Sequence, residues 1–272
     1  MTMTEARFEF GANWARFLST LDENRIRVSE EALQQMLGTE RLDGKTFIDI
    51  GSGSGLSSLA ARRLGATVFS FDYDRQSVAC TQTLRDRYFE NDARWTVEQG
   101  SALDADYLAR LGKFDVVYSW GVLHHTGQMW DALANVAPLV ADGGQLFVAI
   151  YNDQGRVSRI WTFIKRLYNA LPRALRFLVL WPVALRIWGP LMLRDFLLLR
   201  PFRTWRKYSA NRGMSPWHDV VDWVGGYPFE VAKPEQIFDF YRAKGFELTR
   251  MTTCAGGLGC NQFVFVKTRS AP

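Results

Sequence analysis

The sequence predicts an α/β fold with a mostly parallel sheet, a closing antiparallel hairpin and an inserted group of helices. A strand, a glycine-rich loop, a helix and a second strand follow one another within residues 46–72. Short apolar segments then alternate with helix-length segments up to residue 151, as in a parallel sheet built from β-α-β units. Near the C-terminus, two strand candidates flank a turn-rich connection, which is typical of an antiparallel hairpin.

Each strand candidate is a short run rich in apolar and β-branched residues. A helix that begins at Leu56 separates the first two candidates, and a helix over 233–245 precedes the sixth. Three glycines between residues 255 and 259 make the connection between the last two a turn. The candidates are residues 46–50, 67–71, 94–98, 114–119, 145–151, 246–252 and 261–267.

The loop after the first strand has the pattern D-x-G-x-G-x-G. Gly51, Gly53 and Gly55 lie between strand and helix, where glycine permits a tight turn and lets a ligand approach the backbone N–H groups. Asp49 precedes them, and Asp72 ends the second strand, where a carboxylate can accept hydrogen bonds from ribose hydroxyls. The pattern therefore predicts a nucleoside site at the carboxyl edge of the sheet.

The loop differs from a dinucleotide-binding fingerprint, because Leu56 stands where G-x-G-x-x-G requires its last glycine. A carboxylate at Asp49 would repel a pyrophosphate. It favours a ligand that carries positive charge, such as the amino group and sulfonium of S-adenosylmethionine (SAM). The alternative is a structural tight turn in which Asp49 is simply solvated.

Four motifs together resemble those of class I SAM-dependent methyltransferases. They are "FIDIGSGSG", "FSFDYD", "GSALD" and "FDVVYSWGVLHH", in this order and spacing. The chain is most similar to the branch that includes the ubiquinone and menaquinone biosynthesis methyltransferases. The resemblance covers roughly Gly44 to Tyr151, with a weaker match near the C-terminus. It implies a Rossmann-like sheet of seven strands, helices on both faces, and SAM as the cofactor.

The resemblance also implies roles for individual residues of this chain. Around the methionine end of SAM it places Asp49, Gly51, Gly53, Gly55, Trp120 and Gly121. Asp72 corresponds to the ribose-binding acid, and Tyr73 would lie beside the adenine. Ser101, with Ala102 after it, stands where many relatives carry an aspartate that contacts the adenine amino group. Serine can still accept a hydrogen bond there.

Two neighbouring histidines are the candidates for a catalytic base. Transfer of a methyl group from a sulfonium is an in-line displacement, so the protein supplies alignment and, for a protonated acceptor, a base. His124 and His125 follow the fourth strand at the edge where ligands bind, and histidine titrates near neutrality. We favour His125 as the base, while a structural role for both histidines stays open.

Three further residues are candidates for contact with the methyl acceptor. Trp14 lies on an N-terminal helical stripe, which in similar enzymes closes over the cofactor, although simple packing on the sheet is the alternative. Tyr151 ends the fifth strand candidate. His218 lies in an aromatic-rich segment, residues 215–234, that we expect to be an irregular loop, where a structural role is the alternative. No metal site is expected, because the histidines and cysteines lack the spacing of ligands.

Residues 156–212 form a strongly basic and strongly apolar segment. Thirteen cations against one acid give the segment a charge of +12, so the rest of the chain, whose total is +5, carries −7. We expect several helices broken at Pro172, Pro182, Pro190 and Pro201. The longest uncharged run has nine residues, which argues against a membrane-spanning helix.

Three interpretations of this segment remain open: a helical cap or subunit contact, a lid over an apolar acceptor, and a surface for anionic membranes. Aliphatic runs such as "FLLL" argue against a nucleic-acid surface. We predict that residues of 156–212 line the entrance for a partly apolar acceptor. A homodimer is a further open alternative.

Together these features predict one methyltransferase domain over residues 1–272. Its expected parts are an N-terminal helical segment (1–43), a SAM-binding core (44–155), a cap or lid (156–230) and a C-terminal helix with a strand hairpin (231–272). We expect O-methylation of a small or lipid-like acceptor. Methylation of a small thiol and SAM binding without catalysis are the alternatives. Three cysteines and no signal peptide predict a cytoplasmic protein, with membrane association left open.

Overall fold

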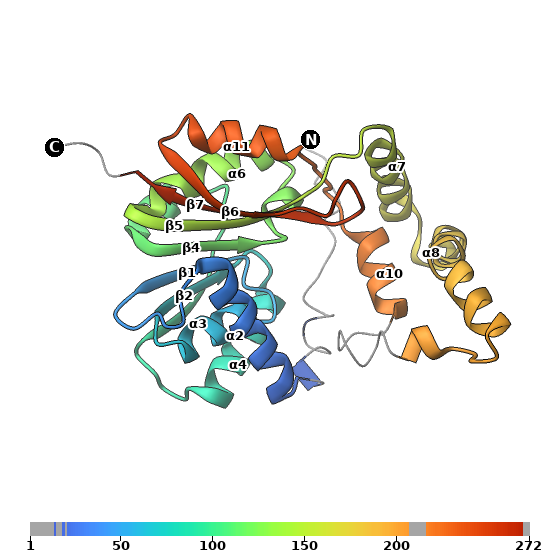
Figure 1. The fold of residues 1–272 in the computed structure, drawn as a ribbon, viewed down its shortest axis with the longest axis horizontal. Coiled ribbons are helices and arrows are strands. Elements are labelled where there is room, and N and C mark those ends of the chain that lie inside the picture. The colour runs from blue at the N-terminus through green and yellow to red at the C-terminus, as the bar shows by residue number, and fades with distance from the viewer. Residues whose placement is uncertain (1–13, 15–17, 20, 207–215, 269–272) are drawn as a thin grey trace.

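The computed structural model describes residues 14, 18–19, 21–206 and 216–268, apart from the side chains of residues 216, 218, 219 and 222. Seven strands form one sheet in the order β3-β2-β1-β4-β5-β7-β6 (Figure 1). The first five strands are parallel, and β7 runs antiparallel to both of its neighbours. The strands are β1 (Thr46–Ile50), β2 (Thr67–Asp72), β3 (Trp95–Gln99), β4 (Phe114–Trp120), β5 (Val140–Tyr151), β6 (Phe246–Thr252) and β7 (Cys260–Lys267). The predicted fold class and all seven strand candidates are confirmed.

Helices cover both faces of the sheet and create two apolar cores (Figure 1). Side chains of a strand alternate between the faces, so Phe47 belongs to one core and Ile48 to the other. One core packs under α2 (Glu23–Leu37), α3 (Leu56–Arg63) and α4 (Arg75–Tyr88). The other packs under α5 (Ala105–Leu111), α6 (Met129–Val136) and α11 (Pro234–Arg242).

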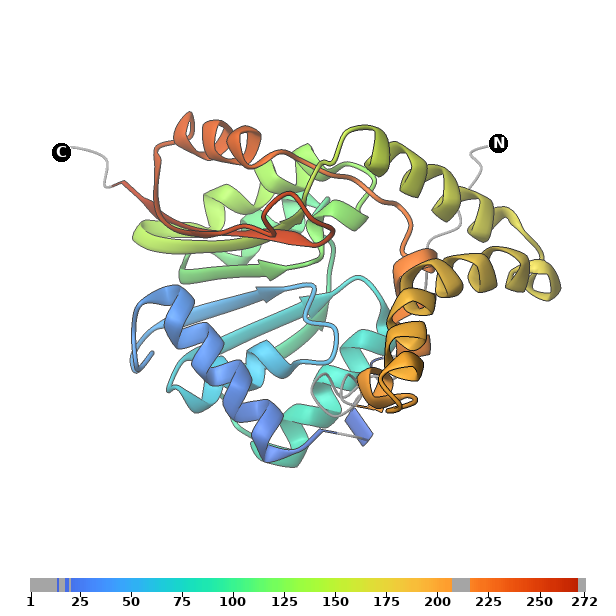
Figure 2. The same cartoon turned by 45° about the vertical axis from the view of Figure 1, so that its right-hand side comes forward.

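A group of helices stands beside the carboxyl ends of the strands (Figures 1 and 2). It contains α7 (Arg156–Ala170), the short 3₁₀ turn η3 (Arg173–Leu175), α8 (Phe177–Leu197) and α10 (Pro216–Gly225). A third apolar cluster holds these helices together. It contains Leu180, Val183 and Trp188 of α8 with Val220 and Val224 of α10.

The prediction that Pro182 and Pro190 break the chain into separate helices is wrong. Both prolines lie inside α8, which continues over 21 residues. Each proline removes one hydrogen bond from the helix interior. Packing compensates, because buried side chains on either side, such as Leu180, Val183 and Trp188, keep the same face of α8 on the cluster. The chain does leave the helix before Pro172 and before Pro201.

The expectation of an irregular loop over residues 215–234 is also wrong in its first half. Residues 216–225 form α10, which places Val220 and Val224 on the apolar cluster. These residues lie four apart, on one side of the helix. Because aromatic residues surround Val220 and Val224, the four-residue spacing does not stand out in the sequence as a helical pattern.

One helix is long and apolar enough to cross a membrane by length and composition alone. It comprises residues Arg173–Leu197, with a mean hydropathy of 1.3, and only 17% of its most apolar window is buried. The length of the longest uncharged run is therefore a poor criterion for a membrane-spanning helix here, because the helix continues through its prolines and arginines.

Candidate functional site

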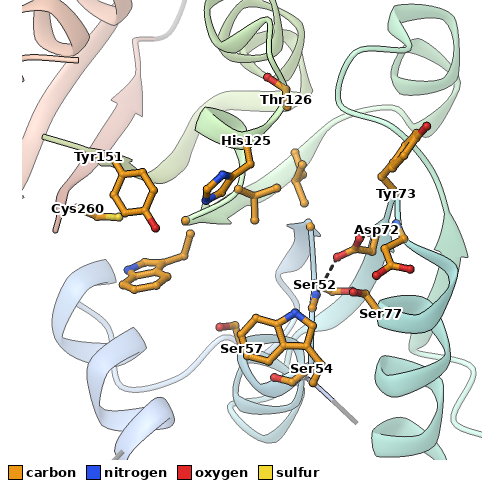
Figure 3. A pocket seen from close by; sticks show the side chains of 18 of the residues that line it. Ser52, Ser54, Ser57, Asp72, Tyr73, Ser77, His125, Thr126, Tyr151 and Cys260 are labelled. Carbon is orange, nitrogen blue, oxygen red and sulfur yellow. Dashed lines mark hydrogen bonds between the residues drawn. The ribbon is translucent and has the colours of Figure 1, made fainter. Parts of the chain in front are cut away.

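A cavity of about 890 Å³ opens at the carboxyl ends of the parallel strands (Figure 3). The ends of β1, β2, β4 and β5 contribute to one wall. The helical segment of residues 156–230, here called the insert, contributes Ile187 and Trp188 from α8 and Val220 and Trp223 from α10. The segment 156–212 thus lines the cavity, as predicted, while its role toward an acceptor stays a prediction.

The glycine loop forms the floor of the cavity. Gly51 and Ser52 donate their N–H groups to the Phe71 carbonyl, which ties the loop to the end of β2. Gly51 and Gly53 line the cavity, both with positive φ. Gly55 is not among the lining residues. It begins α3, and a Cβ there would lie 3.0 Å from the Thr81 backbone of α4, so this glycine serves helix packing.

Gly51→Ala should destabilise the protein by roughly 2–5 kcal/mol. Its φ of +78° costs a side chain about 1–2 kcal/mol, and the new methyl group would overlap Val122, whose own Cβ would lie 2.9 Å away. Gly38→Ala is the matched control, because Gly38 lies in the left-handed α region with a φ of +68° and a Cβ there would meet nothing within 4 Å, so it should lose only about 1–2 kcal/mol. Urea unfolding measures both. Equal losses would show that the Val122 contact relaxes freely.

Asp72 joins the loop to the strand beside it. One carboxylate oxygen accepts the Gly53 N–H at 2.9 Å and the other accepts the Asp74 N–H at 2.9 Å. Figure 3 shows the side chain directed at the loop, beside Tyr73 and Ser77. The acid therefore fixes the loop and presents its carboxylate to the cavity.

Asp49 is the second carboxylate of the floor and is only 2% exposed. It accepts a hydrogen bond of 2.5 Å from Ser58 of α3. Burial, followed by the nearby charge of Asp72, raises the pKa of Asp49 to about 7 despite this bond. Burial likewise raises the pKa of Asp72 to about 6, against the two backbone hydrogen bonds that lower it. A ligand that is positively charged or donates hydrogen bonds would stabilise the ionised form of both carboxylates.

These pKa values predict that SAM affinity rises with pH. The positive methionine end favours ionised Asp49 and the ribose hydroxyls favour ionised Asp72, and these ionised forms are scarce at pH 5 and abundant above the pKa values of about 7 and about 6. Calorimetry should show Kd falling at least roughly tenfold between pH 5 and 7.5. Asp49→Asn removes the upper titration and should flatten the dependence near pH 7. A constant Kd in the wild-type protein would contradict the assignment.

The unliganded protein should respond in the opposite direction. The pKa values of Asp49 and Asp72 in the folded protein lie above the ordinary 3.8, so both groups hold their protons more tightly when folded. Their contribution to the free energy of unfolding is fully present below pH 3.8 and is lost as pH rises through about 6 and about 7. Bound SAM should therefore raise the melting temperature more at pH 8 than at pH 5.

The cavity is also lined by the other residues that the motifs indicated. Tyr73, Ser101, Ala102, Trp120 and Gly121 all line it. The Ser101 hydroxyl accepts the Leu103 N–H at 3.2 Å. Four serines that sequence reasoning did not single out also line the cavity. They are Ser52, Ser54, Ser57 and Ser77.

The two histidines have different environments. His124 is fully buried, its Nδ1 accepts the Tyr151 N–H at 3.3 Å, and its Nε2 has no partner among the described residues. Burial, with His125 and Lys165 nearby, lowers its pKa well below the ordinary value, so it stays neutral. Its ring lies 3.9 Å from that of Tyr151. His124 therefore packs against Tyr151 and does not line the cavity.

His125 does line the cavity and is held in one tautomer. Its Nδ1 lies 2.7 Å from the Pro228 carbonyl, which can only accept a hydrogen bond, so Nδ1 carries the hydrogen. Nε2 is then the basic nitrogen of the ring. Figure 3 places His125 with Tyr151 and Cys260 at one end, and Asp72 with Tyr73 at the other.

An aromatic wall surrounds the His125 end. The ring of Tyr151 lies 5.4 Å from that of His125 and 5.5 Å from that of Trp223. Lys165, buried on the inner side of α7, donates to the Trp223 carbonyl, and its ammonium lies 4.3 Å from the centre of that ring. These contacts fix the wall. Tyr227, Leu258, Cys254 and Cys260 extend it.

The remaining candidates fall in different places. Trp14 lies against Gly53, on the glycine-loop side of the cavity, and its predicted substrate contact stays a prediction. His218 belongs to α10, but its side chain lies outside the described part of the structure. No group of His, Cys, Asp or Glu side chains suited to a metal ion occurs among the described residues.

The residues that position His125 were not predicted. Besides the Pro228 carbonyl, the Glu230 carboxylate accepts the Met129 N–H at 3.0 Å, and the Glu230 N–H donates to the His124 carbonyl. These partners lie about a hundred residues from the histidines, so no local pattern could reveal them.

Comparison with known proteins agrees with this geometry. Residues 48–146 match the family model of a methyltransferase domain. A ubiquinone biosynthesis O-methyltransferase of Sinorhizobium medicae (strain WSM419) is 30% identical over 158 residues, which cover 55% of this chain and 58% of the relative. The protein of the same name from Rhizobium leguminosarum bv. trifolii (strain WSM2304) is 29% identical over 134 residues, covering 48% and 51%. The chain thus spans little more than half the length of these relatives.

Magnesium protoporphyrin IX methyltransferase from Synechocystis PCC 6803, solved with bound S-adenosylhomocysteine (SAH), has a similar fold. The TM-score is 0.53 with 95% of each chain covered and 16% sequence identity, so this likeness concerns the fold alone. The motifs, the sheet order and the family match all coincide at the same glycine loop and the same two aspartates. Residues 48–146 of this chain therefore match the model of a methyltransferase domain, within a fold like that of a methyltransferase solved with SAH.

Proposed function

We propose that the chain is a SAM-dependent methyltransferase that methylates an aromatic hydroxyl group of a small, partly apolar acceptor. The observation that carries this proposal is His125, which faces a cavity with a cofactor floor at one end and an aromatic wall at the other. The names of the relatives support oxygen as the accepting atom and a ubiquinone-like precursor as the acceptor class.

The residues present fit SAM at the floor of the cavity. The glycines leave room at the loop, Asp72 offers a carboxylate to ribose hydroxyls, and Asp49 lies where a positive methionine end would be attracted. Bound there, SAM supplies an activated methyl group for in-line displacement, with neutral SAH as the leaving product.

The chain itself orients the acceptor and removes its proton. The apolar wall around Tyr151, Trp188 and Trp223 binds an aromatic ring and excludes water. The Pro228 carbonyl keeps the hydrogen of His125 on Nδ1, so Nε2 accepts the proton of the acceptor hydroxyl as the oxygen–methyl bond forms. The imidazolium then returns that proton to solvent.

Two other functions remain testable against this one. A small thiol could occupy the same end of the cavity, since a thiolate needs little help from a base. SAM binding without turnover is the second. We would incubate the protein with methyl-labelled SAM and a panel of prenyl-substituted catechols, simple phenols and alkanethiols. Labelled ethers support the proposal, labelled thioethers support the thiol alternative, and tight binding without product from any acceptor overturns methyl transfer.

A further inference from the structure

The outer surface of the insert exposes an unusual amount of apolar side chain. Fifteen of the twenty-one large hydrophobic residues that are exposed in the described structure lie between residues 157 and 202. Monomeric proteins seldom leave so many apolar residues together in water without a functional reason. The outer face of α7 and α8 therefore needs a partner.

Helix α7 carries apolar side chains on its outer side as well as on its inner side, where Trp161, Ile164 and Tyr168 pack on the third apolar cluster. Its inner side carries Ser158, Lys165 and Tyr168, all buried. Its outer side exposes Val157, Ile160, Phe163 and Leu167, which follow the helical repeat. A helix in contact with water alone would place these side chains inward. The sequence of α7 is thus suited to an apolar medium on its outer side.

Helix α8 continues the same surface. Leu185 is 71% exposed and Phe196 is 68% exposed, while Trp188, three residues after Leu185, is buried and lines the cavity. Figures 1 and 2 show α7 and α8 side by side at the outer end of the molecule. The exposed hydrophobic residues of this part are Val157, Ile160, Phe163, Leu167, Leu175, Phe177, Leu178, Trp181, Leu185, Leu193, Phe196, Leu197, Leu198, Leu199 and Phe202.

Exposed arginines are interspersed with these apolar residues. They are Arg156, Arg159, Arg166, Arg173, Arg186, Arg194, Arg200, Arg203 and Arg206. Asp195 is the acid of the segment; it is buried, lies 3.7 Å from Arg194, and accepts the Thr204 hydroxyl and N–H. The ion pair with Arg194 is the one that the structure places within residues 156–206. The surface is therefore cationic as well as apolar.

We propose that the outer face of α7 and α8 binds the surface of an anionic lipid bilayer, with the apolar side chains in the interface and the arginines at the phosphate level. Both halves of the surface are satisfied by such a partner, since acyl chains cover the hydrophobic residues and anionic headgroups pair with guanidinium groups. This proposal does not depend on the proposed methyl transfer.

A second copy of the chain fits this face less well. In a symmetric dimer the same patch meets itself, so the arginines of both copies would be brought together with a single buried acid each. A membrane-spanning α8 fits less well too. The helix holds Leu180 and Val183 against α10 and carries exposed Arg186 and Arg194 along its length, which favours a position in the plane of the interface.

Flotation with vesicles tests the proposal on the full chain. Vesicles of phosphatidylcholine alone are compared with vesicles that also contain phosphatidylglycerol, at low and at high sodium chloride. We expect binding to the anionic vesicles only, with loss at high salt. Each arginine near the surface changes affinity about fivefold, so Arg159→Gln, Arg186→Gln and Arg200→Gln together should weaken binding by about a hundredfold. Arg110→Gln in α5 with Lys113→Gln just after it, two exposed cations far from α7 and α8 in the sequence, should change it little.

The apolar half of the surface needs a separate variant. Phe163→Gln, Leu185→Gln and Phe196→Gln should abolish flotation while the melting temperature is kept, because all three side chains are already exposed. Val28→Gln with Met251→Gln, exposed outside the insert, is the matched control. Failure of the folded wild-type protein to bind anionic vesicles at low salt overturns the proposal. So does a dimer that the apolar variant dissociates, or a protein released from vesicles by detergent but not by salt.

Discussion

Asp72→Ala is expected to weaken SAM and SAH binding by about 10- to 150-fold at pH 8. The carboxylate is the acid at the end of β2 that faces the cavity, and a charge-assisted hydrogen bond to a ligand is worth about 1.5–3 kcal/mol. Its pKa of about 6 means that it is ionised at this pH. Isothermal titration calorimetry measures the change, and an unchanged Kd would refute the ribose assignment.

The same carboxylate also holds the loop, so a control must separate the two roles. Asp72→Asn keeps an oxygen that can accept the Gly53 N–H but loses the charge and one acceptor. If Asp72 binds ribose, the asparagine variant should keep the melting temperature and still lose most of the affinity. If both variants lose affinity only in proportion to stability, Asp72 serves the loop alone.

The sheet could be predicted because its signals are local. Every strand of it is a short apolar run, and the glycine loop with Asp49 and Asp72 marks the carboxyl edge within a span of 24 residues. The positions of Tyr73, Ser101 and Gly121 in the cavity follow from that edge, because the loops after parallel strands meet there. The cofactor end of the site is thus largely encoded next to the strands that build it.

The His125 end of the cavity could not be predicted in the same way. The choice between His124 and His125 depends on the Pro228 carbonyl, 103 residues further along the chain. The helical state of residues 216–225, and the passage of α8 through Pro182 and Pro190, depend on apolar packing between two distant segments. Local propensity gives the wrong answer where such tertiary contacts outweigh the loss of a hydrogen bond.

His125→Asn is expected to reduce the turnover number by about 10²- to 10⁴-fold with little change in SAM affinity, the usual effect of removing a general base. The asparagine amide can replace Nδ1–H as donor to the Pro228 carbonyl, so the loop should keep its structure while the basic nitrogen is lost. Initial rates with labelled SAM and the best acceptor of the panel give the turnover number. Calorimetry gives the SAM affinity of the same preparation.

The pH dependence separates catalysis from structure. If His125 takes the proton of a phenolic acceptor, the variant should regain activity as pH approaches the pKa of that phenol, because the acceptor then ionises without help. His124→Asn is the matched control: its side-chain oxygen can still accept the Tyr151 N–H, and His124 itself stays neutral, so the pH profile should keep the shape of the wild type. A His125 variant that loses SAM affinity in parallel with turnover would be structural. A variant with full turnover would mean that alignment alone, on an already ionised acceptor, drives the reaction.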